Sequence, residues 1–268
     1  MTPTAALSGT ATQSTPEGGV LMSQSTPTGA SGAPIVVLVH GAFADASSWA
    51  AVIPMLQAAG VTVKAPANPL RSVSGDAAYI ASVVNQIPGP VLLVGHSYGG
   101  VVISNAAPQA TNVVGLVYVA AFIPDEGESL QGLAEQATDN QLAPALRPAQ
   151  FPTGEGEEPA VELYIDEAMF HDVFCTDLPA AQAAAMAVSQ RPGGAIGFGE
   201  PSGPVGWKTL PSWAVVATSD VTIGVTGERF MAERAGAEIV EVDASHVVML
   251  SQPQAVNDVI LQAVAAVS

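Results

Sequence analysis

The amino-acid sequence predicts an α/β fold: a mostly parallel, doubly wound sheet flanked by helices, with a helical cap insertion. Strand-like and helix-like segments alternate along the chain with short connections, which is the pattern of βαβ units and a parallel sheet. The expected strands are continuous apolar runs, as is typical of strands that are covered on both faces. The chain has 268 residues, 49% of them hydrophobic, which is enough for one such domain with a sizeable core.

The elements follow in order from residue 35. We expect a strand at 35–39, a helix at 46–59, and then a strand at 61–65, a helix at 75–87, and strands at 90–94, 113–119, 213–218 and 238–242. In the first helix, Trp49, Val52 and Leu56 recur at helical spacing, so Trp49 is expected in the core. Because Pro54 lies inside this segment, the helix is expected to bend or to begin late.

The first 33 residues are rich in Thr, Ser, Gly, Ala and Pro, and they predict a disordered leader. This segment has neither a charged n-region nor a long apolar run, so it does not resemble a secretory signal. No apolar run approaches the length of a membrane-spanning helix. Cys175 is the single cysteine, which excludes an internal disulfide, and it is expected to be a buried thiol. Together these observations favour a cytoplasmic protein.

The charge balance limits the partners that the chain can bind. Lys and Arg number 7 against 24 acidic residues, a formal net charge of −17. A basic surface for nucleic acid or an anionic membrane is therefore not expected. The His and Cys positions show no metal-ligand spacing, and neither a metal nor another cofactor is expected. The oligomeric state is left open.

The run from Val91 to Gly100 carries the clearest chemical signal. An apolar strand ends in Gly95-His96-Ser97-Tyr98-Gly99, and a helical segment follows. This strand–turn–helix context is the one that a nucleophile elbow requires. Small residues are needed on either side of the sharp turn, which presents Ser97 Oγ at the carboxyl edge of the sheet. The Tyr98 N–H and the start of the next helix would then lie where negative charge is stabilised.

The partners of Ser97 are predicted from their order along the chain. In proteins with this elbow a carboxylate follows the nucleophile, and a histidine follows the carboxylate. His246 lies on a loop after the last expected strand and is the expected base. Asp220 follows the preceding strand and is the expected acid, which would hold the imidazole in the required tautomer. Asp243 and Asp125 remain alternatives, although a local Asx-turn is the other role for Asp243.

The loop after the first strand is expected to complete an oxyanion hole. It reads His40-Gly41-Ala42-Phe43, and the Ala42 N–H is the expected second donor, with Phe43 as the alternative. Gly41 permits the turn that directs this amide inward. His40 and His96 both lie at strand ends, and we expect them to be packed, hydrogen-bonded supports rather than a second base.

Three segments together resemble the α/β-hydrolase fold superfamily: His40–Trp49, Gly95–Gly100 and Val242–His246. The resemblance extends from about Pro34 to Val267. More narrowly, the chain looks like a branch of small bacterial hydrolases that is similar to the plant esterase and hydroxynitrile lyase group. The resemblance implies a catalytic triad and two oxyanion donors, namely Ser97, Asp220 and His246, with Ala42 and Tyr98.

The loop around Asp220 departs from the pattern of this group. Members often carry an acidic residue before the aspartate and Ile-Pro shortly after it. Here the segment reads Ser219-Asp220-Val221-Thr222-Ile223-Gly224, so the aspartate remains but the loop is expected to differ in shape.

Between about Phe122 and Trp207 the pattern changes, and this range is expected to form a cap within a single domain at 34–268. Proline and glycine are frequent, and helices are expected at about 126–136, 161–171 and 179–190. The acidic cluster at 155–158 is expected to be a solvated loop. Candidate substrate-binding residues are Phe43, Phe122, His171, Phe174 and Trp207. For His171 the alternative is a satisfied helix histidine, and for Trp207 it is core packing.

These residues predict a serine hydrolase that cleaves small, mostly apolar carboxylic esters through an acyl-enzyme, without a cofactor. An amidase, a lactonase or a perhydrolase would use the same triad and stays open. A hydroxynitrile lyase is disfavoured, because Gly41 stands where the resemblance implies a threonine and no lysine lies near His246 in sequence. A haloalkane dehalogenase needs an aspartate at the elbow, and Ser97 excludes it. A non-catalytic protein that binds a small ligand is the alternative from another class.

Overall fold

A computed structural model describes residues 32–154 and 156–268 of the chain. Its main sheet has six strands in the order β2-β1-β3-β4-β8-β9, and every neighbouring pair runs parallel. The strands are β1 (Ile35–Val39), β2 (Val63–Lys64), β3 (Val91–Ser97), β4 (Val113–Ala121), β8 (Ser212–Ala217) and β9 (Glu238–Val242). The parallel sheet predicted from the sequence is therefore present.

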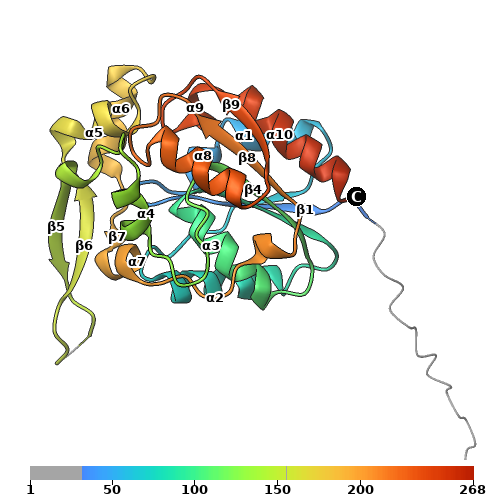
Figure 1. Ribbon diagram of the computed structural model, residues 1–268, viewed down its shortest axis with the longest axis horizontal. Helices are drawn as coiled ribbons and strands as arrows, with labels where there is room; N and C mark the ends of the chain where they lie inside the picture. Colours follow the sequence, from blue (N-terminus) through green and yellow to red (C-terminus); the bar gives the residue numbers. More distant parts are fainter. Residues whose placement is uncertain (1–31, 155) are drawn as a thin grey trace, which may run out of the picture.

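Helices cover both faces of this sheet, with α1 and α10 above it and α2 and α3 below it in the view of Figure 1. The helices around this sheet are α1 (Val52–Ala58), α2 (Val73–Val84), α3 (Tyr98–Ala106), α8 (Val225–Arg234), α9 (Val248–Ser251) and α10 (Pro253–Ala266). Short 3-10 helices are η1 (Ala46–Trp49), η2 (Ala107–Gln109), η3 (Ala143–Ala145) and η4 (Gly206–Lys208). Because both faces are covered, every residue of β3 and β8 is buried.

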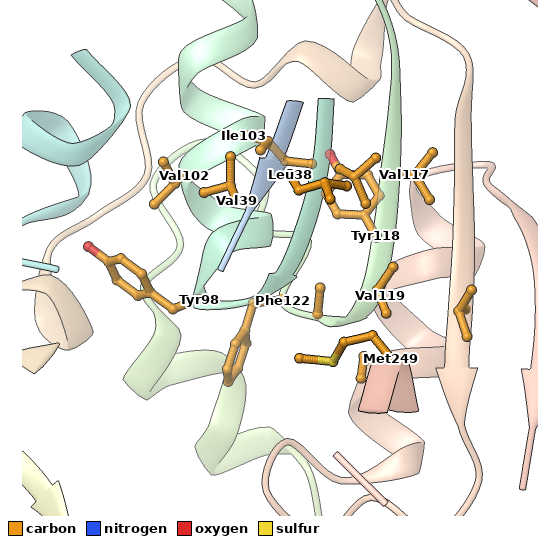
Figure 2. Close-up of a cluster of buried hydrophobic side chains, with 14 of the residues drawn as sticks. Leu38, Val39, Tyr98, Val102, Ile103, Val117, Tyr118, Val119, Phe122 and Met249 are labelled. Carbon is orange, nitrogen blue, oxygen red and sulfur yellow. The ribbon is translucent and has the colours of Figure 1, made fainter. Parts of the chain in front are cut away.

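The core lies between the central strands and these helices. Figure 2 shows Val39 of β1 and Val117 and Val119 of β4 among the packed side chains, with Ile103 of α3 and Met249 of α9. All five are buried. This packing fixes the carboxyl ends of β1, β3 and β4, the edge at which the predicted reactive residues stand.

The segment between β4 and β8 forms a separate layer at one end of the molecule, on the left of Figure 1. It holds α4 (Leu130–Gln136), β5 (Leu146–Phe151), β6 (Ala160–Ile165), α5 (Glu167–Phe174), α6 (Ala180–Ser189), β7 (Gly193–Gly194) and α7 (Ala195–Gly199). The three strands form an antiparallel sheet in the order β5-β6-β7. This segment, which the sequence predicts to be a cap, is thus built from helices and a small sheet.

The helix predicted at 161–171 is wrong in its first half. Residues Ala160–Ile165 form β6, and α5 begins only after Asp166, whose side chain accepts a hydrogen bond from Ala168 N. Val161, Tyr164 and Ile165 favour a strand, and pairing with β5 supplies the backbone hydrogen bonds. The helix expected at 126–136 starts at Leu130, because Ser129 accepts from Gly132 N and caps it.

The helix predicted at 46–59 is divided in two. The first part, η1, ends at Trp49, and α1 starts at Val52. Pro54 lies in the first turn of α1, where its missing N–H leaves no intrahelical hydrogen bond unmade. Trp49 is fully buried, as expected for a core residue.

Other boundaries shift by a few residues. The strand expected at 61–65 is shorter, since β2 covers only Val63–Lys64. The helix expected at 75–87 starts at Val73, after Ser72 caps it by accepting from Gly75 N, and it ends at Val84. The strand expected at 90–94 continues to Ser97 as β3.

Two predictions concern segments that the structure describes only in part. The leader predicted for residues 1–33 lies outside the described residues except for its last two positions. Of the acidic cluster, Gly156, Glu157 and Glu158 are exposed, and Glu155 lies outside the described residues. In the described part of the chain, no helix is both long enough and apolar enough to cross a lipid bilayer.

Candidate active site

Ser97 is the last residue of β3 and stands immediately before α3. Its backbone has φ 54° and ψ −122°, in the region of positive φ that non-glycine residues rarely adopt. Such strain persists only where the surrounding structure imposes it, and it is concentrated at functional sites. The Ser97 carbonyl accepts a hydrogen bond of 3.3 Å from Phe122 N, which ties the turn to the end of β4.

Three glycines allow the backbone to approach Ser97 closely. A Cβ atom added to Gly95 would lie 2.5 Å from the Gly99 oxygen, and one added to Gly99 would lie 2.4 Å from the Val39 oxygen. The elbow therefore excludes any side chain at these two positions. A Cβ on Gly41 would lie 2.7 Å from Ser97 Cβ, so the loop after β1 is pressed against the serine.

His246 and Asp220 form a buried pair. His246 Nδ1 lies 2.6 Å from Asp220 Oδ2, and each residue is 1% exposed. The other carboxylate oxygen accepts from Thr222 N at 2.6 Å and from Ile223 N at 3.1 Å. Burial alone would raise the pKa of Asp220, but the charge of His246 and the hydrogen bond from it lower this pKa to about 2. The loop without Ile-Pro still delivers the carboxylate to the histidine.

This pairing determines which nitrogen of His246 can act as a base. Because the ionised Asp220 only accepts hydrogen bonds, His246 Nδ1 carries the proton. Nε2 then has the free lone pair, and it is buried without a hydrogen-bond partner among the described residues. That tautomer is the one a general base needs when its Nδ1 is held by a carboxylate.

The loop that carries His246 is fixed from two sides. The His246 carbonyl accepts a hydrogen bond of 2.9 Å from His96 Nε2. Ser245, the preceding residue, donates through its N–H to Asp177 Oδ2 at 2.9 Å, and its hydroxyl also bonds to Asp177. Asp177 follows α5, and nothing in its sequence context distinguished it from a solvated loop residue.

The alternative acids lie elsewhere. Asp243 is exposed and accepts a hydrogen bond of 3.1 Å from Ser219 Oγ. Asp125 forms an ion pair with Lys208, and its side chain is partly exposed. Among the described residues, Asp220 is the carboxylate that bonds to the His246 ring.

The loop after β1 offers one free amide beside Ser97. Phe43 has φ 61°, and its N–H donates to the Arg191 oxygen at 2.9 Å, so this amide is already engaged. The N–H of Ala42 has no acceptor in the part of the chain that the structure describes. Tyr98 is the first residue of α3, where N–H groups lack intrahelical acceptors. Ala42 and Tyr98 are thus the two amides available near Ser97.

The two strand-end histidines are buried supports. His40 Nε2 accepts from Asn68 N at 2.9 Å, while its Nδ1 donates to the Gly41 oxygen at 2.9 Å. Burial lowers the pKa of His40, so it stays neutral in this arrangement. Burial and the neighbouring His246 hold the pKa of His96 well below its ordinary value. Both imidazoles are therefore neutral hydrogen-bonding groups.

Three of the five candidate substrate-binding residues lie near the Asp220–His246 pair or border a cavity. The Phe174 ring lies 5.1 Å from the His246 ring and 6.2 Å from that of Phe43. Phe122, seen near Met249 in Figure 2, lines a cavity of about 510 Å³. Phe198 lines the same cavity, and its ring lies 6.1 Å from Phe43. Sequence reasoning missed Phe198, because it stands in a short glycine-rich segment without periodicity.

The other two candidates have their polar atoms satisfied within the protein. His171 Nε2 donates to the Leu178 oxygen at 3.0 Å. Trp207 Nε1 donates to the Pro124 oxygen at 2.8 Å. Neither residue lines the cavity that contains Phe122. These contacts match the alternatives that the sequence left open for both residues.

Sequence reasoning also missed Glu228, which stands on α8 and is 2% exposed. Its Oε2 accepts from Ala217 N at 3.1 Å, and its side chain lies close enough to the Asp220 carboxyl group for each to shift the pKa of the other. A glutamate on a helix is usually solvated, so the sequence carried no signal for this contact.

No metal centre or reactive thiol is evident at the site. The described residues contain no group of three or more His, Cys, Asp or Glu side chains that could hold a metal ion. Cys175 is buried, and burial raises the pKa of its thiol to about 12.

Comparison with known proteins places this geometry in a family. A family model described as the alpha/beta hydrolase family matches residues 36–259, from β1 into α10. The chain belongs to the alpha/beta hydrolase family. It is also related to plant esterases, in agreement with the resemblance noted in its motifs.

Several relatives of this alpha/beta hydrolase are named hydrolases or esterases. A pyrethroid hydrolase of Sphingobium wenxiniae is 25% identical over 242 residues, which cover 84% of this chain and 85% of that protein. A carbendazim hydrolyzing esterase of Nocardioides sp. is 33% identical, over 40% of this chain and 50% of that protein. Salicylic acid-binding protein 2 of Nicotiana tabacum is 29% identical, over 48% of this chain and 55% of that protein.

Solved structures share the fold of this family member. A pyrethroid hydrolase crystallised with BIF has a TM-score of 0.72 at 23% identity, covering 87% of this chain and 98% of that one. Polyneuridine aldehyde esterase has a TM-score of 0.73 at 21% identity, covering 85% and 98%. At these identities the likeness establishes the fold alone.

Proposed function

We propose that this alpha/beta hydrolase is a serine esterase that cleaves small, mostly apolar carboxylic esters through an acyl-enzyme intermediate. The observation that carries the proposal is the buried Asp220–His246 pair, in which His246 Nε2 has no hydrogen-bond partner among the described residues. It occurs together with Ser97, whose backbone is strained at the end of β3. The names of the relatives support ester hydrolysis, because they include a carbendazim hydrolyzing esterase and a pyrethroid hydrolase.

In the proposed mechanism, His246 Nε2 removes the proton from Ser97 Oγ as this oxygen attacks the ester carbonyl. The N–H groups of Ala42 and Tyr98 bind the developing oxyanion, and losing one such donor typically costs about 10²–10³ in rate. His246 then gives the proton to the leaving alkoxide. Water repeats the sequence on the acyl-enzyme and releases the acid.

The cavity beside the site supports an apolar substrate. Its volume is about 510 Å³, within the range of small-molecule sites. Most of its lining is apolar, and the polar side chains are few. The apolar lining includes Phe122, Leu130, Leu142, Leu146, Leu163 and Phe198. Neither lysine nor arginine lines it, so an anionic ester would find no counter-ion there.

The same proposal covers the domain organisation and the cofactor requirement. Residues 34–268 would form one domain, with residues 122–207 as a cap that shapes the substrate site over the nucleophile. No cofactor enters the proposed mechanism, because side chains and backbone amides of the chain perform every step. The expected partner is thus a small-molecule ester.

A series of p-nitrophenyl esters, from acetate to decanoate, tests the proposal. We expect the wild-type protein to hydrolyse short members and the Ser97→Ala variant to lose this activity. Ser212→Ala is the matched control, because Ser212 is also buried but lies at the other end of the sheet. Full activity in Ser97→Ala would overturn the proposal. The chain-length optimum would give the size of the acyl site.

A further inference from the structure

Glu228 and Asp220 are both buried, and their side chains lie close enough for each to shift the pKa of the other. Both residues are bonded to Ala217, the last residue of β8: Ala217 N donates to Glu228 Oε2 at 3.1 Å, and the backbone N–H of Asp220 donates to the Ala217 oxygen at 3.1 Å. Glu228 Oε1 is buried and receives no hydrogen bond from a protein donor among the described residues. The Asp220 carboxyl group is within reach of a hydrogen bond from this side chain.

The hydrogen-bond donors and charges around Asp220 and Glu228 determine which of the two acids can be ionised. Asp220 has three donors, namely His246 Nδ1 and the amides of Thr222 and Ile223. Glu228 has one donor, Ala217 N. Besides Asp220, the acidic Asp139 raises its pKa, and the cationic Arg229 on the same helix interacts with its charge. Two carboxyl groups in hydrogen-bonding contact need a proton between them, because like charges this close cannot both ionise.

The proton belongs to Glu228 rather than to Asp220. His246 and two amides favour the charged form of Asp220, whereas Glu228 forms no ion pair among the described residues. Burial and the charge of Asp220 raise the pKa of Glu228 well above its ordinary value. With the proton on Glu228 Oε1, this oxygen is a hydrogen-bond donor. That explains why it accepts no hydrogen bond although it is buried.

We propose that Glu228 is a positioning residue for the triad: it stays a neutral carboxylic acid, and its Oε1–H donates a hydrogen bond to the Asp220 carboxylate. The inference rests on the proposed function of Asp220 and His246. This bond would hold the carboxylate in the orientation that reaches His246 Nδ1. Above the pKa of Glu228, loss of its proton would break the bond and set a second negative charge against Asp220.

Two substitutions separate this role from simple packing. Glu228→Gln keeps an oxygen that can accept from Ala217 N and an N–H that can donate to Asp220, and it cannot ionise. Glu228→Leu removes both hydrogen bonds at similar volume. We expect Glu228→Leu to lower kcat by about 10- to 100-fold, the cost of a hydrogen bond to a charged group, and Glu228→Gln to restore most of this loss.

The pH profile of ester hydrolysis gives a readout that a packing role would not move. We expect kcat/KM of the wild type to fall at alkaline pH as Glu228 ionises, and this limb to shift or disappear in Glu228→Gln. Glu162→Gln is the control, since Glu162 is another buried acid, paired with Arg71 in the cap. An alkaline limb that is the same in wild type and Glu228→Gln would overturn the inference.

Infrared spectroscopy tests the proton without any substrate. In the difference between wild-type and Glu228→Gln spectra at pH 7, we expect the C=O stretching band of a protonated carboxyl group. Its absence would overturn the inference and leave the esterase proposal untouched. If the band is present but the wild type hydrolyses no ester, the proposed function fails while the protonation of Glu228 is supported.

Discussion

The His96 side chain donates a hydrogen bond of 2.9 Å to the His246 carbonyl, and the two imidazole rings lie 4.7 Å apart. His96 directly precedes Ser97 on the elbow, while His246 is 150 residues further along the chain. The loop of the proposed base is therefore bonded to the turn that carries the proposed nucleophile.

Replacing His96 with leucine should uncouple these two parts. We expect kcat to fall more than about tenfold with a smaller change in KM, because the buried His246 carbonyl loses its donor and its loop can shift. Stability should fall by about 1–3 kcal/mol, the cost of an unsatisfied buried group. Asn112→Leu is the control, since Asn112 bonds three carbonyls at the opposite end of β4. Steady-state kinetics and urea unfolding check both effects; equal loss of kcat in the two variants would contradict the coupling.

Asp220→Asn should leave the packing intact and reduce kcat by about 10³- to 10⁴-fold, as expected when the group that fixes the histidine tautomer is lost. The amide can present an N–H to His246 Nδ1, which would move the proton to the wrong nitrogen. Asp243→Asn serves as the comparison, because Asp243 bonds to Ser219 and not to the histidine. A near-normal rate for Asp220→Asn would transfer the role of the acid to another carboxylate.

The same aspartate predicts how stability changes in acid. Its pKa is lowered from 3.8 to about 2, so the folded state binds this proton more weakly than the unfolded chain does. The stabilisation is present above pH 3.8 and is lost as the pH falls toward 2. Denaturant unfolding of wild type and Asp220→Asn from pH 6 to pH 2 should show the wild-type advantage shrinking over that window. An advantage that stays constant throughout would contradict the lowered pKa.

The raised pKa of Glu228 predicts that stability changes with pH in the opposite direction. Because its folded-state pKa is raised, the folded protein binds this proton more tightly than the unfolded chain, and stability is lost as the pH rises above the ordinary value of 4.5. Glu228→Gln removes this ionisation. We expect the free energy of unfolding of the variant, relative to wild type, to increase from pH 5 to pH 9. Parallel curves for the two proteins would mean that Glu228 ionises normally.

The elements and motifs near the elbow were predictable because they depend on local pattern. Alternating apolar runs and helical segments indicated the parallel sheet, and the glycine spacing around Ser97 indicated the turn that the structure contains. His246 and Asp220 were predictable from chain order, although their loops are 26 residues apart in sequence. The contact between His246 and Asp220 depends on the strand ends that carry the two loops, and not on a particular loop sequence.

The contacts that sequence reasoning missed are long-range and involve ordinary residue types. Asp177 bonds to Ser245, and Asp220 raises the pKa of Glu228, yet both Asp177 and Glu228 stand in segments that resemble a solvated surface. Phe198 lies on a five-residue helix that is too short to show a period. The β6 strand was mistaken for a helix because its partner β5 lies across a proline- and glycine-rich loop, and pairing outweighs local propensity.

Gly41 provides the most local test of the proposed oxyanion loop. A Cβ at this position would lie 2.7 Å from Ser97 Cβ and 3.0 Å from the His96 oxygen, so Gly41→Ala must move either the loop or the elbow. Since the Ala42 amide follows directly, we expect kcat to fall by about 10²- to 10³-fold, the cost of one misplaced oxyanion donor. Gly132→Ala is the control, because its Cβ would make only an ordinary contact of 3.4 Å with Ser129 Oγ in α4. Wild-type kcat in Gly41→Ala would show that the loop has no part in stabilising the oxyanion.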